Sequence, residues 1–345
     1  MKKVVLIVII LSLLSAAGCA PAEQPAESFV FTDSCGREVQ IYETDSIAPT
    51  GAMAQMVLMP LASDLFCGLA SDWSSEAELY LKEELLTLPL YGQIFNGKGD
   101  MNLEEVIRLS PDVLIDIGET RPGMAEELDQ LQEQTGIPTV HIQTTLDTMG
   151  TTYQMLGTLL GRQGKADELS AYCEEIYQRT AEIIASLDTS ETQTVVYCLG
   201  DKGLNVLARG SYHAELLDML CENIAILENP SPSGFGNEID MEQLLLWDPH
   251  WILFAPDSVY ASAGSDPLWN RLSAISNGQY AEVPQGPYNW MGMPPSVNRY
   301  LGMIWLTDLL YPNETTFDLY EEVADYYALF YDCHLTEDMF SALID

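Results

Sequence analysis

Apolar residues along this chain recur with two alternating periods, one typical of buried strands and the other of amphipathic helices. Short apolar runs predict strands near residues 46–49, 65–70, 113–117, 138–142, 194–199 and 280–283. Helical spacing predicts helices over residues 50–61, 77–85, 103–109, 124–134, 148–160, 213–221, 268–274, 297–310, 316–331 and 336–344. The polar stretch Ser34–Arg37 predicts the turn of a β-hairpin over residues 29–41. Strands that alternate with helices indicate parallel sheets of the doubly wound type.

One part of this pattern occurs twice. Residues 102–115 align without a gap on residues 240–253. Each copy begins with a helix-capping residue type, carries a glutamate two positions later (Glu104 and Glu242), and continues through a short helix and a proline into a buried strand. Copies so far apart predict two related α/β lobes rather than a solenoid, whose repeats follow each other every few tens of residues. Two lobes create a cleft between them, and a cleft suggests a ligand.

The longest helical pattern covers residues 166–187. A helix of that length spans roughly 33 Å, enough to connect two lobes. The predicted fold is therefore α/β, with two doubly wound lobes joined by one long rigid helix and a ligand cleft between them. The predicted boundaries are 29–164 for the first lobe, 165–188 for the connecting helix and 189–345 for the second lobe.

The first residues form a targeting segment. Two lysines precede an apolar run over residues 4–14, which is too short to span a bilayer comfortably, so residues 1–18 are predicted to be a secretory signal. Small residues directly before Cys19 are typical of a bacterial lipoprotein, in which that cysteine is lipidated and residues 19–28 form a flexible tether. A cleaved signal with an incidental cysteine is the alternative. We expect an extracytoplasmic protein, anchored to the cell membrane through its lipid.

Charge narrows the range of partners. The chain has 52 acidic and 14 basic residues and a formal net charge of −38. Such a chain is repelled by nucleic acid and by anionic lipid, so neither is an expected partner. The same charge opposes long-range steering of anionic ligands, and any recognition of an anion must be local.

Cysteines and histidines give no sign of catalysis. Besides Cys19 there are six cysteines without a CxxC pair, and the sequence does not distinguish disulfides from free thiols. The chain has no GxSxG motif, and its four histidines are scattered, which suggests neither a catalytic triad nor a metal site. We therefore expect no enzymatic activity, no cofactor and no resident metal.

Several segments resemble one known family, in the same order and with similar spacing. They are residues 31–39, the two glutamate-bearing copies, residues 266–269, and residues 294–302 with the continuation to 312. In these the chain resembles the class III substrate-binding proteins of ABC importers, which handle ferric siderophores, haem and cobalamin. The resemblance implies a monomeric receptor that captures an iron complex of the ferric siderophore kind and delivers it to the permease and ATPase of an importer. Cobalamin, haem, molybdate or tungstate, and a bare divalent metal ion remain alternative cargoes.

The resemblance also implies a docking role for the repeated glutamates. In that family a glutamate on each lobe docks onto arginines of the permease, and the matching positions are Glu104 and Glu242. Each lies in the first turn of a predicted helix, where the helix dipole favours an anion. Glutamates are also common at helix starts without any such role.

Ligand-binding candidates follow from the strand order, because open α/β sheets bind ligands at the carboxyl ends of their strands. The candidates are Thr50, Met53, Trp73, Tyr91 and Arg121 in the first lobe, and Arg209, Tyr212, Phe235, Tyr288, Trp290 and Arg299 in the second. Aromatic rings offer flat surfaces to a large ligand, and arginine pairs with carboxylate, phenolate or oxyanion groups. Burial in the core is the alternative for the two tryptophans, solvent exposure for Arg121 and Arg209, and bracing of the next helix for Arg299.

Overall fold

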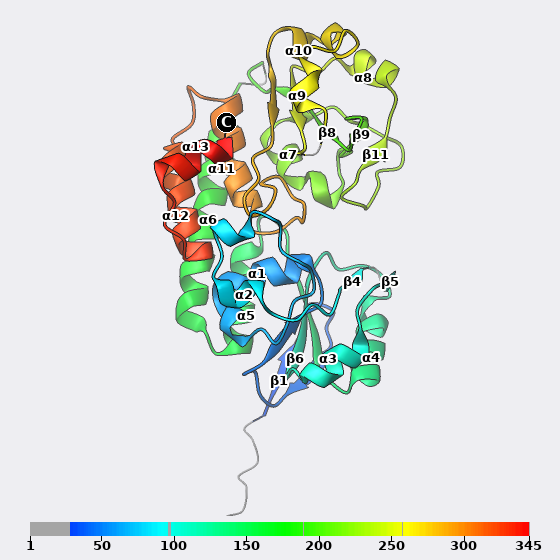
Figure 1. Cartoon of the computed structure of the whole chain (residues 1–345), viewed down its shortest axis with the longest axis vertical. Helices are drawn as coiled ribbons and strands as arrows, with labels where there is room; N and C mark the ends of the chain where they lie inside the picture. Colours follow the sequence, from blue (N-terminus) through cyan, green and yellow to red (C-terminus); the bar gives the residue numbers. More distant parts are fainter. Residues whose placement is uncertain (1–27, 96–97, 189, 257, 345) are drawn as a thin grey trace, which may run out of the picture.

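The computed structural model describes residues 28–95, 98–188, 190–256 and 258–344. Figure 1 shows two lobes, one around strand β6 at the bottom of the view and one around strand β8 at the top. Each lobe has its own sheet with helices packed against it. The predicted fold class, two α/β lobes, is confirmed.

The first lobe is built on three parallel strands in the order β3-β6-β7. These are β3 (Ile47–Pro49), β6 (Val113–Gly118) and β7 (Thr139–Gln143). The strands are almost entirely buried because helices cover the sheet, as parallel sheets require. The covering helices are α1 (Ala52–Ala62), α4 (Met124–Thr135) and α5 (Met149–Leu160).

Two predicted elements of this lobe are wrong. No strand forms over residues 65–70, because Phe66 bridges to Ile47 whereas Leu69 bridges to Leu90, so the segment pairs with two different partners. The helix predicted over residues 77–85 is broken by the extended backbone of Lys82. In place of that helix the chain forms a 3₁₀ turn over Ala77–Leu79 and the short helix α2 (Glu83–Leu86). Further along, β4 (Ile94–Phe95) and β5 (Lys98–Gly99) form a small antiparallel ribbon.

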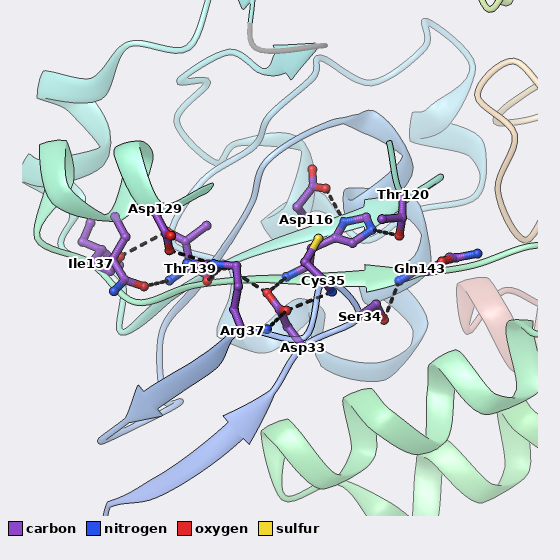
Figure 2. Close-up of polar contacts among 12 residues, drawn as sticks. Asp33, Ser34, Cys35, Arg37, Asp116, Thr120, Asp129, Ile137, Thr139 and Gln143 are labelled. Atoms are coloured by element: carbon purple, nitrogen blue, oxygen red, sulfur yellow. Dashed lines mark hydrogen bonds and ion pairs between the residues drawn. The ribbon is translucent and has the colours of Figure 1, made fainter. Parts of the chain in front are cut away.

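The predicted hairpin forms from β1 (Phe29–Thr32) and β2 (Glu38–Ile41), and its turn covers the free edge of β7 (Figure 2). The Ser34 amide donates to the carbonyl of His141 at 2.9 Å, and Ser34 Oγ accepts from the Gln143 amide at 2.9 Å. Arg37 Nη1 donates to the carbonyl of Thr139 at 2.8 Å. These contacts satisfy groups that an edge strand otherwise leaves exposed.

The second lobe has a sheet in the order β11-β9-β8-β12-β13, with β10 also paired to β8. Its strands are β8 (Thr194–Leu199), β9 (Asn205–Val206), β10 (Glu222–Asn223), β11 (Asn237–Glu238), β12 (Trp251–Phe254) and β13 (Tyr280–Glu282). The pairs of β8 with β10 and β12, and of β12 with β13, are parallel, whereas β9 and β11 form an antiparallel edge. Its helices are α7 (Glu215–Leu220), α8 (Met241–Trp247), α9 (Tyr260–Ala263) and α10 (Ser273–Ser276).

The sequence repeat is a structural repeat. The first copy forms α3 (Leu103–Leu109), capped by Asn102, which accepts from the Glu105 amide at 3.1 Å. The second forms α8, capped by Asp240. Each helix ends at a residue in the left-handed conformation, and each leads through a proline into a central strand, β6 or β12.

Helix α6 (Gln163–Ser186) follows the first lobe and precedes the second along the left side of the view (Figure 1). Its 24 residues span roughly 36 Å. After the second lobe the chain forms α11 (Arg299–Leu310), α12 (Leu319–Tyr331) and α13 (Glu337–Ile344). Because α11 packs on α6 and α7 while α12 packs on α1, these terminal helices add a second connection between the lobes. None of the described helices is long and apolar enough to cross a membrane.

Candidate ligand-binding cavity between the lobes

A cavity of about 1080 Å³ is lined by residues of both lobes. The first lobe contributes the start of α1, the β4–β5 ribbon, the end of β6 and one face of α4. The second contributes the segment before α7, residues 232–235 and residues 292–295. The carboxyl end of β6 lies in this wall, as expected for an open parallel sheet.

Four of the predicted ligand-binding residues line this cavity: Met53, Arg121, Tyr212 and Phe235. Tyr212 reaches from the second lobe to the first, where its hydroxyl donates to the carbonyl of Thr144 at 2.8 Å and lies 3.7 Å from Met53 Sδ. Burial raises the pKa of Tyr212 to about 12, so its hydroxyl stays protonated and remains a donor. Phe235 is largely exposed, so its ring is available to a ligand.

Four predicted aromatic residues lie outside the cavity lining. Tyr91 is buried and donates its hydroxyl to the carbonyl of Pro49 at 2.7 Å. Trp290 is fully buried within the main hydrophobic core. Trp73 and Tyr288 contact each other across the lobes, with ring centroids 6.1 Å apart, and Trp73 Nε1 donates to a main-chain carbonyl of α2. The structure gives these four residues packing roles.

Two predicted arginines also lie outside the lining. Arg209 Nε donates to the carbonyl of Asn223 at 2.6 Å, which ties the arginine to β10. Arg299 is completely buried at the start of α11, and its Nη1 lies 2.8 Å from Glu215 Oε2. The guanidinium carbon of Arg299 lies 5.3 Å from the ring centroid of Tyr212, a residue of the cavity lining. Nε and Nη2 of Arg299 have no hydrogen-bond partner among the described residues.

Arg121 lines the cavity but is already paired. Its Nη1 donates to Glu127 Oε1 at 2.8 Å, and Nη2 donates to Oε2 of the same carboxylate. This hydrogen-bonded pair raises the pKa of Arg121 and lowers the pKa of Glu127, so both side chains stay charged at neutral pH. The pair therefore presents little net charge to a ligand.

Sequence reasoning missed Asp116, which lines the cavity at the end of β6 (Figure 2). Its Oδ1 accepts from Thr50 Oγ1 at 2.5 Å, and its Oδ2 lies 2.7 Å from Nδ1 of the buried His141. Because a carboxylate only accepts, we assign a proton to Nδ1, and Nε2 lies 2.9 Å from Thr120 Oγ1. The sequence signal was available, since Asp116 is the one charged residue in the otherwise apolar strand Val113–Gly118.

His213 is a second residue of the lining that sequence reasoning did not include among the candidates. Burial lowers its pKa from the usual 6.5, with a further lowering by the positive charge of Arg299. The imidazole is therefore neutral at pH 7. It adds hydrogen-bonding capacity to the cavity without adding charge.

The predicted docking residues lie outside the cavity. Glu104 and Glu242 are both exposed in the first turn of their helices, α3 and α8. The six cysteines after Cys19 are free thiols in this structure. Cys19, the predicted signal and all but residue 28 of the predicted tether lie outside the described residues. Among the residues described, no three His, Cys, Asp or Glu side chains come together as a metal-binding group.

The fold and its interlobe cavity define a class of two-lobed α/β binding proteins. Residues 68–286 match the periplasmic binding protein family. The chain therefore belongs to this family, the class III substrate-binding proteins of ABC transporters. Members of this family are extracytoplasmic binding proteins that partner with a permease and an ATPase, and they are not enzymes.

Three relatives illustrate the similarity. The Fe(3+)-citrate-binding protein YfmC of Bacillus subtilis (strain 168) is 23% identical over 186 residues, which cover 53% of this chain and 56% of that protein. The alignment thus spans little more than half of that relative. An ABC transporter solute binding protein from Sulfurospirillum deleyianum DSM 6946 superposes with a TM-score of 0.83 at 23% identity, covering 91% of this chain and 98% of that one. The molybdate-bound periplasmic binding protein MolA of Haemophilus influenzae gives a TM-score of 0.69 at 19% identity, covering 89% and 99%.

Proposed function

We propose that this protein is a lipid-anchored receptor that captures a ferric siderophore-like complex and presents it to the permease of an ABC importer. The observation that carries the proposal is the cavity of about 1080 Å³ between the lobes. A single water takes up about 30 Å³ in the liquid, so a bare metal ion or a small oxyanion would fill only a small part of this space. A chelate of several hundred daltons matches it, since ligand sites enclose most of the ligand surface.

The lining fits a bulky organic ligand. It combines thioether side chains, such as Met53 and Met293, with the aromatic rings of Tyr212 and Phe235 and a limited number of polar groups. Apolar contact over a wide area with a few directional polar contacts is the usual composition of such sites. The name of the related YfmC, a binder of Fe(3+)-citrate, supports an iron complex as the first choice of cargo.

The delivery step rests on Glu104 and Glu242. Their equivalent positions on two repeated helices and their exposure support a role in docking, one lobe to each half of a permease. The N-terminal dipole of each helix stabilises the carboxylate without neutralising it, which leaves it available to an arginine of the partner. Lipidation of Cys19 would keep the receptor next to that permease.

The test is a titration of the intrinsic tryptophan fluorescence of residues 20–345 with ferric siderophores, ferric citrate, haem, cobalamin, molybdate and divalent metal ions. We expect saturable quenching with a one-to-one stoichiometry at micromolar or lower concentration of a ferric chelate. If only haem or cobalamin binds, the proposed receptor function stands, but the proposed cargo is wrong. A response to molybdate or to a bare ion only would overturn the assignment of a bulky cargo.

A further inference from the structure

The described side chains that line the interlobe cavity carry an excess of negative charge. Three carboxylates, Asp116, Glu119 and Glu127, face one permanent cation, Arg121. Because Arg121 and Glu127 satisfy each other, the charges left for a ligand are those of Asp116 and Glu119. His213 adds no positive charge, since its pKa lies below the usual value.

The carboxylate of Asp116 is held in a fixed direction. Both of its oxygens have buried partners on the far side, Thr50 Oγ1 at 2.5 Å and His141 Nδ1 at 2.7 Å. The His141 side chain is fully buried, whereas 21% of the Asp116 side chain is still exposed. The hydrogen bonds therefore orient the charge while leaving part of the group accessible from the cavity.

Glu119 is different, because it is exposed and no hydrogen bond or ion pair holds its side chain among the described contacts. Burial is the main cause of the raised pKa of Tyr212 on the opposite wall; Arg299 lowers this pKa, whereas the negative charges of Glu215 and, to a smaller extent, Glu119 raise it. Glu119 thus acts on the same space as Asp116. A carboxylate without a partner beside a cavity is available to a cationic group of a ligand.

Among the described residues of the lining, the one cation is Arg121, which Glu127 already pairs, so no lining cation is left to offset these two charges. Arg299 is buried beside Tyr212 and His213 but is not part of the lining, and its Nη1 pairs with Glu215 Oε2 at 2.8 Å, so the carboxylate of Glu215 offsets its charge. The formal charge of the whole chain, −38, adds a potential of the same sign. An anionic chelate would enter this cavity against like charges, in surroundings where such charges are poorly screened.

We propose that the cargo is a positively charged metal chelate whose cationic arm, such as an ammonium group, lies beside Asp116 and Glu119. A ferric trihydroxamate with a free ammonium has this chemistry, whereas a ferric tricatecholate and ferric citrate are anions. The inference rests on the proposed function and narrows it to one charge class. It assigns Asp116 and Glu119 as the residues that select this class.

A series of probes that differ in charge tests this inference. The probes are ferrioxamine B, a ferric trihydroxamate with an ammonium arm, its neutral N-acetyl derivative, a ferric tricatecholate and ferric citrate, each titrated into the mature chain at low salt. We expect ferrioxamine B to bind tightest and N-acetylation to weaken binding by about tenfold or more, the usual value of a hydrogen bond between charged groups. Tighter binding of either anion overturns the charge inference and leaves the ferric cargo standing. No binding of any ferric complex overturns both.

Matched variants test whether Asp116 and Glu119 supply the negative charge that binds the cationic arm. Glu119→Gln removes a carboxylate without a described partner, and Asp116→Asn keeps the shape and the accepting oxygen that Thr50 or His141 uses. Each variant is expected to weaken ferrioxamine B several-fold and its N-acetyl derivative much less. The control, Glu126→Gln, removes the same charge from an exposed position of α4 outside the cavity lining and should change neither affinity. Equal effects of Glu119→Gln on both probes, or none on either, would refute the assignment.

Discussion

Gly302 lies where α11 crosses the loop that leads to the cavity, and its substitution by alanine is predicted to destabilise the protein. A Cβ atom at this position would lie 2.4 Å from the carbonyl oxygen of Trp290 and 2.6 Å from Leu216 Cδ2. The first of these is a backbone atom, so it cannot move aside by changing a rotamer. The helix and the loop must therefore separate to admit one methyl group.

The magnitude follows from two opposing effects. Alanine in place of glycine in a helix interior gains about 1 kcal/mol. Forcing an extra carbon into a packed interior costs about 1–3 kcal/mol, and more when backbone must shift. Because the backbone must shift here, the cost lies at the upper end of that range, and we expect Gly302→Ala to lower the free energy of unfolding by about 2 kcal/mol. Gly164→Ala in α6, where nothing lies within 4 Å of the added Cβ, should raise it by about 0.5–1 kcal/mol.

Urea unfolding followed by circular dichroism measures both variants. The same variants also test the cavity. Gly302 contacts Trp290, and Trp290 directly precedes residues 292–295, which line the cavity. Gly302→Ala should therefore weaken ligand binding, whereas Gly164→Ala should leave it unchanged. Stabilisation by both substitutions, or unchanged stability of Gly302→Ala, would refute the close approach of α11 to this loop.

Three further predictions address docking, pH dependence and packing. The double variant Glu104→Ala, Glu242→Ala should bind cargo like the wild type but fail to support uptake; loss of binding by the purified variant would contradict the docking role. Since burial depresses the pKa of His213, its neutral form contributes stability above the unfolded pKa near 6.5, and this contribution is lost as pH falls through the folded pKa. Urea midpoints measured from pH 8 to 5 should thus fall less steeply in His213→Gln; identical slopes would exclude this contribution. Tyr91→Phe should lower the free energy of unfolding by about 1–2 kcal/mol, because the Pro49 carbonyl loses its hydrogen-bond donor. If the variant instead loses ligand affinity while its stability is unchanged, Tyr91 contacts the ligand.

Local signals predicted much of the fold because they are contained in a few neighbouring residues. The two repeated helices begin at capping residues and end before a proline, and the structure has them over the predicted residues in the first copy, 103–109. The strand predicted over residues 65–70 was wrong because this segment bridges to two residues that are far apart in the sequence, Ile47 and Leu90. No local pattern distinguishes that arrangement from a strand.

The site was less predictable, because burial depends on packing between distant segments. Arg299 follows two prolines in a loop-like sequence, yet it is fully buried, paired with Glu215 of α7 and beside the ring of Tyr212. Trp290 is fully buried as well, and its backbone carbonyl lies against α11 at Gly302. Asp116, in contrast, was visible as a lone charge in an apolar strand, which is a signal that a buried strand rarely carries without a reason.

The most direct test of the central claim is the position of the metal. Crystals of the protein grown with a ferric chelate that quenches its fluorescence should give an anomalous iron peak between the lobes, within the cavity bounded by Met53, Tyr212 and Phe235. A single peak at this place is the predicted result. Iron bound only on the outer surface, or no ordered iron in crystals of the saturated complex, would contradict the account.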